Sequence, residues 1–263
     1  MRWRDRPLAF QVAALGGATV DPLAILSDTF DGGDLDMLDR GWTRVDDTTT
    51  PAGDGRITTL QKEATAYLLS IDAGGGTGSL HLNDNRGVQW HKELTGALWG
   101  VECLVTLRNA ADSGNPPGTN YRLAGLIAHE AHGNALADHV SLCWGTGNGA
   151  FPRAFWAHTV AGSSGALGNT TPGFNVSATL SGASRYLRML RDRANSDRWV
   201  LQHKANAGDV WTTIRDVLRG AVSTPMPNTV YVGPTVFSDQ AAHDVAGRFD
   251  YVRFFTPAAS DFP

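Results

Sequence analysis

Carboxylate side chains are the first candidates for chemistry in this sequence. Retaining glycoside hydrolysis needs two carboxyl groups about 5 Å apart, and a strand supplies such a pair when acids alternate on one face. The chain has four glutamates: Glu63, Glu93, Glu102 and Glu130. None of them has another acid two positions away, and the alternating pair Asp34 and Asp36 lies in a glycine-flanked loop. The sequence therefore predicts that the chain is not an enzyme.

Histidines form a second candidate group. The zinc-protease motif places two histidines four residues apart on a helix, whereas His129 and His132 are three apart at the end of a predicted strand. With His139 they leave two alternatives open. They form a metal site, or they are surface-loop histidines.

Aromatic residues between positions 144 and 156 offer binding rather than catalysis. Sugars are held by aromatic stacking together with a few polar groups in a shallow site. The predicted ligand-binding residues are Trp144, Asn148, Phe151, Arg153 and Trp156, with Trp90 as a second platform. The alternative for each tryptophan is packing in the core.

The composition argues against two classes of partner, nucleic acids and membranes. The net charge is −4 and no basic run occurs, so we expect no nucleic-acid partner and no membrane partner. No apolar run approaches the roughly 20 residues that a membrane span needs. Cys103 and Cys143 lie in apolar stretches, which predicts two buried free thiols; a single bridge is the alternative.

The elements that must position these residues are strands. Thirty glycines and 12 prolines in 263 residues favour short strands and turns. Segments of strand length, rich in β-branched or aromatic residues, lie at 66–72, 98–107, 121–129, 139–144, 153–160, 174–180, 186–191, 199–204, 210–214, 229–237 and 247–255. In the last one, simple alternation sets Phe249, Tyr251 and Phe255 on one face. The pattern predicts an all-β, two-sheet antiparallel sandwich.

The sequence resembles concanavalin A-like, laminin-G-like β-sandwich domains of the jelly-roll type. The resemblance spans residues 27–256 and rests on Tyr-Leu-Arg at 186–188, Trp199, Trp211, Val-Gly at 232–233, Phe-Asp-Tyr-Val-Arg at 249–253 and Ala-Gly-Leu-Ile at 124–127. That fold hosts lectins, glucanases and structural modules. The glucanases carry Glu-x-Asp-x-Glu on one strand, which this chain lacks.

The resemblance also implies a cofactor. Calcium sites of these sandwiches join the first and last strands, which nominates Asp28 and Asp250 as calcium ligands. Asp28 begins a run of aspartates that reaches residue 39. Several oxygen ligands in an irregular loop suit calcium, and the alternative is a solvated acidic turn.

The first 26 residues are predicted to be an N-terminal docking arm, followed by the sandwich at 27–263. In this hypothesis Trp3 and Phe10 anchor the arm on other subunits of an assembly. We therefore predict a non-catalytic, lectin-like structural or adhesion component of a bacteriophage virion, as a tail, fibre or head-decorating protein, with surface glycans as candidate ligands. The alternatives are a secreted carbohydrate-binding module and a glycoside hydrolase with an atypical acid pair.

Overall fold

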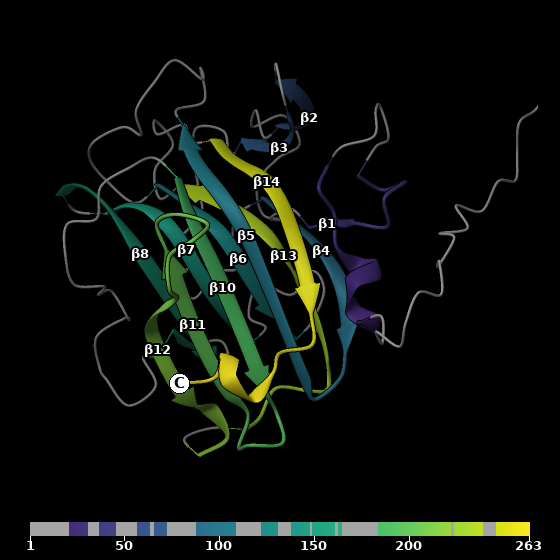
Figure 1. Cartoon of the computed structure of the whole chain (residues 1–263), viewed down its shortest axis with the longest axis vertical. Coiled ribbons are helices and arrows are strands. Elements are labelled where there is room, and N and C mark those ends of the chain that lie inside the picture. The colour runs from purple at the N-terminus through teal and green to yellow at the C-terminus, as the bar shows by residue number, and fades with distance from the viewer. Residues whose placement is uncertain are drawn as a thin grey trace, which may run out of the picture.

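The computed structural model describes most of the sandwich. It covers residues 21–30, 37–45, 57–63, 66–72, 88–108, 122–130, 138–147, 149–160, 163–164, 184–221, 224–238 and 246–263, with only the backbone at 44–45, 57–63, 66–72, 88, 122, 146–147, 149–160, 163–164 and 237–238. The strands form two stacked layers (Figure 1). Within the described residues, no helix is long and apolar enough to cross a membrane.

Two seven-stranded sheets make up the layers, and the described strand pairings are antiparallel. The first sheet has the order β1 (Thr43–Val45), β4 (Val88–Thr95), β13 (Thr229–Ser238), β6 (Arg122–His129), β7 (His139–Gly147), β8 (Gly149–Val160) and β9 (Ser163–Ser164). The second has the order β12 (Thr212–Leu218), β11 (Arg198–Lys204), β10 (Ser184–Asp192), β5 (Leu98–Arg108), β14 (Ala246–Phe255), β3 (Ala66–Asp72) and β2 (Ile57–Glu63). The predicted two-sheet sandwich is confirmed.

The core lies between the sheets and follows the alternation of β5. Five alternate side chains of β5 are at most 1% exposed: Trp99, Val101, Cys103, Val105 and Leu107. They share one face because successive strand side chains point to opposite faces. Five such residues on one face identify the inner side of the second sheet. Both cysteines are free and buried, as predicted.

Most predicted segments match observed strands. β3 occupies 66–72 as predicted. The segment at 210–214 is displaced: β12 begins at Thr212 because residues 205–209 form the preceding turn. β4 was not predicted as a strand, since charged Lys92 and Glu93 interrupt its apolar pattern. The predicted strand at 174–180 lies outside the described residues.

A β-bulge changes the faces of β14. The register against β5 shifts by one residue between Phe249 and Tyr251, which leaves Asp250 as the extra residue. Phe249 is fully buried in the core, whereas Tyr251 and Phe255 lie partly exposed on the outer face. The prediction that these three aromatic residues share one face is therefore wrong, because a bulge reverses the alternation beyond it.

Residues 21–30 lie along β14 beyond Phe249, where its pairing with β3 ends (Figure 1). Asp21 caps the N-terminus of the short 3-10 helix η1 (Pro22–Leu26). The Asp21 carboxylate also accepts hydrogen bonds from Thr256 N at 2.6 Å and Thr256 Oγ1 at 2.9 Å. Asp28 and Val252 exchange two backbone hydrogen bonds of 2.8 Å. This part of the predicted arm thus packs on the sandwich itself.

A buried ionic cluster ties the β10–β11 turn to the first sheet. The Arg191 guanidinium donates to Asp197 at 2.7 Å, and both side chains are fully buried. The other Asp197 oxygen accepts from Met226 N at 2.8 Å. Arg219, from η2 (Arg219–Ala221), pairs with Asp138, which directly precedes β7. Buried charges persist only when paired in this way.

Candidate functional site

An aromatic row crosses the outer face of the second sheet. Tyr251 of β14 lies opposite Leu104 of β5, and Leu104 lies opposite Tyr186 of β10. Tyr186 in turn lies opposite Lys204 of β11. The Lys204 ammonium is 5.3 Å from the Tyr186 ring and 4.7 Å from the ring of Trp211, which directly precedes β12. All three aromatic side chains are partly exposed. We call Tyr251, Tyr186 and Trp211 the aromatic row.

A polar row runs beside it, one pleat further along the same strands. Arg253 lies opposite Glu102, and Glu102 lies opposite Arg188. Arg253 Nη2 is 3.0 Å from Glu102 Oε1, and Arg188 Nε donates to Gln202 Oε1 at 2.8 Å. Gln202 then donates to Thr213 Oγ1 at 3.2 Å. These side-chain contacts link the strands to one another beside the aromatic row.

The C-terminal residues border the polar row. Asp261 of η3 (Ala259–Asp261) accepts from Arg188 Nη1 at 3.0 Å, and the Phe262 ring lies 5.4 Å from the Arg198 guanidinium carbon. Burial lowers the pKa of Arg188, while Asp261 counteracts this by stabilising the cation. The contacts of residues 261–263 therefore fall on Arg188 and Arg198. The Arg188 guanidinium carbon itself lies 4.5 Å from the centre of the Trp211 ring, so Trp211 contacts both Arg188 and Lys204.

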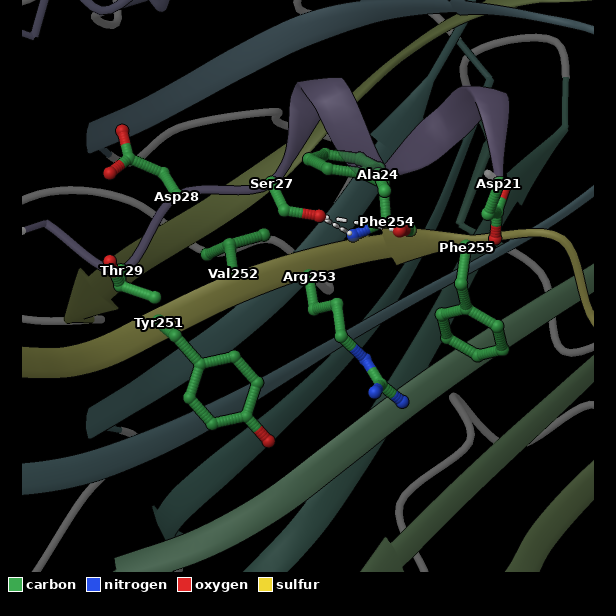
Figure 2. Close-up of a pocket in the computed structure, with 10 residues that line it drawn as sticks. All are labelled: Asp21, Ala24, Ser27, Asp28, Thr29, Tyr251, Val252, Arg253, Phe254 and Phe255. Atoms are coloured by element: carbon green, nitrogen blue, oxygen red, sulfur yellow. Dashed lines mark hydrogen bonds between the residues drawn. The ribbon is translucent and has the colours of Figure 1, made fainter. Parts of the chain in front are cut away.

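A pocket of about 510 Å³ lies at the β14 end of the row. Its walls are Asp21, Ala24, Ser27, Asp28, Thr29, Tyr251, Val252, Arg253, Phe254 and Phe255. Figure 2 shows the side chains of Tyr251, Arg253 and Phe255 extending from the same side of β14, with η1 along its other side. The Arg253 side chain is 56% exposed. The pocket thus combines aromatic rings with an accessible cation.

Burial and neighbouring groups shift the pKa values of two pocket residues. Burial raises the pKa of Tyr251, and the neighbouring Glu102 carboxylate raises it further; the Tyr251 hydroxyl donates to Glu102 Oε1 at 3.4 Å. Burial opposes ionisation of Asp21, but hydrogen bonds from Thr256 and Leu23 leave its pKa lowered. Tyr251 is consequently a neutral aromatic ring at ordinary pH. The site suits a ligand with apolar faces and hydroxyl-bearing edges.

Two tryptophans predicted to bind ligand lie in the core. Trp144 has no exposed surface, and the Arg185 guanidinium carbon lies 4.4 Å from its ring centre. Trp90 is 5% exposed and also belongs to the core cluster. As folded, neither presents a ring face at the surface. The remaining predicted residues lie outside the described side chains, and their role stays a prediction: Asn148, Phe151, Arg153 and Trp156.

The structure describes the surroundings of both predicted calcium ligands, Asp28 and Asp250. Asp28 Oδ1 accepts from Phe30 N at 2.7 Å and Arg40 Nη1 at 2.8 Å, and Oδ2 accepts from Trp42 Nε1 at 2.9 Å. Asp250 is the bulge residue, and burial raises its pKa. Among the described residues, no three His, Cys, Asp or Glu side chains are grouped for metal binding. Calcium binding by this pair stays a prediction.

The predicted histidine group lies only partly within the described residues, and the predicted arm anchors lie outside them. His129 and His139 are directly opposed on β6 and β7 and buried to within 1%, so these two are not surface-loop histidines. The His129 ring contacts His91 at a centroid distance of 5.3 Å. The arm anchors Trp3 and Phe10 lie outside the described residues, and their docking role stays a prediction.

The aromatic row was not predicted as a binding site from the sequence. Tyr186 and Trp211 were recognised only as markers of strands and of the resemblance. A usable signal existed for Tyr186, because its neighbour Leu187 already supplies the core-facing residue, which leaves the tyrosine facing outward. No such signal existed for Tyr251, since the bulge at Asp250 is not visible in the alternation.

Comparison with known proteins identifies similar folds. No family model and no curated protein matches the sequence. A GH43 protein from Bacillus licheniformis has a TM-score of 0.60 at 12% identity, covering 93% of this chain and 41% of that chain. A xylan β-1,4-xylosidase from Bacillus halodurans C-125 has a TM-score of 0.55 at 17% identity, covering 92% and 40%. A functionally unknown protein from Saccharomyces cerevisiae has a TM-score of 0.55 at 12% identity, covering 83% and 97%.

These comparisons contradict the prediction that the chain is not an enzyme. Several similar structures are GH43 glycoside hydrolases, so the missing Glu-x-Asp-x-Glu of one group of glucanases does not exclude hydrolysis. The chain spans about two fifths of the length of the GH43 chains just described. At these identities the likeness shows the β-sandwich fold alone.

Proposed function

We propose that this chain binds carbohydrate on the outer face of the second sheet. The observation that carries the proposal is the aromatic row: the partly exposed rings of Tyr251 and Tyr186 lie in one register row, and Lys204 of that row contacts the ring of Trp211. A hydrogen-bonded polar row lies beside it. Pyranose rings present apolar C–H faces that stack on aromatic rings, while their hydroxyl groups pair with polar side chains. The pocket beside β14 supplies a defined end to this surface.

The similar structures support the choice of ligand class. The sandwich recurs in chains that include a xylan β-1,4-xylosidase, and it corresponds there to part of a longer protein. A sandwich that holds polysaccharide for a protein of this kind needs an open binding surface. The outer face of the second sheet has that form, and xylan is the first ligand to test.

The testing experiment is affinity electrophoresis of the full chain in gels that contain xylan, xyloglucan, mixed-linkage β-glucan or no polysaccharide. We expect retardation by at least one polysaccharide. Trp211→Ala and Tyr186→Ala are expected to abolish it, whereas Leu218→Ala, which truncates a 45% exposed side chain at the far end of β12, leaves it unchanged. Free migration of the wild-type chain in every gel contradicts the proposal.

The predicted virion role has no support in these comparisons. It stays a prediction, as does docking through the arm. Adhesion to a surface glycan would use the same aromatic row, so the electrophoresis experiment bears on that prediction as well.

A further inference from the structure

We infer that the ligand is a linear, extended polysaccharide that lies across the strands from β14 to β12, rather than a single terminal sugar. The inference rests on the proposed function and adds the form and direction of the ligand. We argue it from the register of the paired strands.

The spacing of the rings follows from sheet geometry. Neighbouring strands lie about 4.8 Å apart, and Tyr251 and Tyr186 are separated by β5 with Leu104 between them. Their backbones are therefore about 10 Å apart along a line perpendicular to the strands. On the other side Lys204 of β11 lies opposite Tyr186, and its neighbour His203 lies opposite Thr212, so Trp211 follows next to Lys204, whose ammonium contacts the Trp211 ring. The rings thus recur at one regular interval.

That interval corresponds to the repeat of an extended β-linked glycan. In a β-1,4-linked chain that the protein holds in an extended twofold conformation, successive sugars turn over, so alternate sugars present the same face. A chain lying along the row stacks every second sugar on a ring. A terminal monosaccharide would use one ring and leave the other two without a ligand.

The positions between the rings suit the intervening sugars. Leu104 is partly buried and offers an apolar contact, and it stands between the two tyrosines. The Lys204 ammonium is held by donation to the carbonyl of Ala207 at 2.6 Å. It lies between Tyr186 and Trp211, where it can also donate to a sugar hydroxyl.

The two ends of the row differ. At the β14 end, η1 and Arg253 form the walls of the pocket. At the other end, the β11–β12 turn is exposed, and Val210 beside Trp211 is 88% exposed. A long chain can therefore extend beyond Trp211, with its other end at the pocket.

The test is titration calorimetry of the full chain with xylobiose, xylotriose, xylotetraose and xylopentaose. We expect the affinity to rise by on the order of tenfold for each further ring engaged. Trp211→Ala should lower the affinity for xylopentaose by about tenfold more than it lowers the affinity for xylobiose. Trp211→Phe should restore most of the gain, and Leu218→Ala should match the wild type. Circular dichroism verifies that each variant is folded.

The outcomes separate the inference from the proposed function. If xylobiose binds as tightly as xylopentaose, or if Trp211→Ala weakens both equally, the row is not a chain-length platform and the inference is overturned while carbohydrate binding stands. If none of these ligands binds and no polysaccharide retards the chain in gels, the proposed function fails, and the inference fails with it.

Discussion

The ring of Phe255 lies directly over Gly100 on the outer face of the second sheet. A Cβ atom at residue 100 would come 2.5 Å from Cζ of Phe255 and 2.9 Å from Cε1. The missing side chain lets the ring lie flat against β5, where Phe255 forms part of the pocket wall. The shape of the pocket therefore depends on a glycine in the neighbouring strand.

Gly100→Ala is expected to destabilise the fold by about 1–3 kcal/mol, because the new methyl group must displace the Phe255 ring. Urea unfolding measures this loss. Gly208→Ala is the matched control, since an added Cβ there meets no atom within 4 Å. In a Phe255→Ala background the cost of Gly100→Ala should nearly vanish. An equal cost in both backgrounds would show that another contact is responsible.

Asp197→Asn is expected to cost about 3–5 kcal/mol, because it leaves the buried Arg191 guanidinium without its counter-charge. Asparagine keeps the shape and tolerates the positive φ of 50° at this position. The control is Asp216→Asn, which breaks the more exposed pair with Arg198 and should cost less than about 1 kcal/mol. Equal losses in chemical denaturation would contradict the assignment.

His203 should make the folded state sensitive to acid. Burial and the nearby Arg185 lower its pKa below the ordinary value of 6.5, so the unfolded chain binds a proton at higher pH than the folded chain does. The contribution of His203 is therefore intact above pH 6.5 and is lost as the pH falls below that value. Unfolding free energies at about pH 7 and about pH 5 should differ less in His203→Gln than in the wild type. An unchanged difference rules out this residue.

Asp28 is expected to act through its protein partners. Its two oxygens accept from Phe30 N, Arg40 and Trp42, and removing the acceptors in Asp28→Ala should cost about 1.5–3 kcal/mol. An equal melting temperature of the wild type in calcium and in chelator would show that the carboxylate acts through these contacts alone. A calcium-dependent rise that Asp28→Ala removes would instead support the predicted calcium site.

The aromatic contribution of Tyr251 can be separated from its hydroxyl group. Tyr251→Phe keeps the ring and loses only the hydrogen bond to Glu102, so polysaccharide retardation in gels should persist. Tyr251→Ala removes the ring and should weaken retardation. If both variants weaken retardation equally, the hydroxyl group rather than the ring contacts the ligand; if neither does, Tyr251 does not contact it.

Local pattern determined much of the architecture. The alternation of β5 from Trp99 to Leu107 identified a core-facing side without any tertiary information, because a strand repeats every two residues. Segment length and β-branched or aromatic composition predicted β3, β10, β11 and β13, and the apolar stretches around Cys103 and Cys143 predicted buried free thiols. These features depend only on neighbours within one strand.

The site depended on contacts that no strand contains by itself. Trp144 and Trp211 look alike in sequence, yet the first is enclosed between the sheets and the second lies partly exposed on an outer face. The aromatic row exists only through pairing of β14, β5, β10 and β11, and Tyr251 joins it because a bulge shifts one register. The sequence by itself determined most of the strand segments and the buried face of β5, because these follow from local composition and alternation. Only the tertiary structure decided which aromatic rings meet, because strand order and register are set by pairing between residues far apart in the chain.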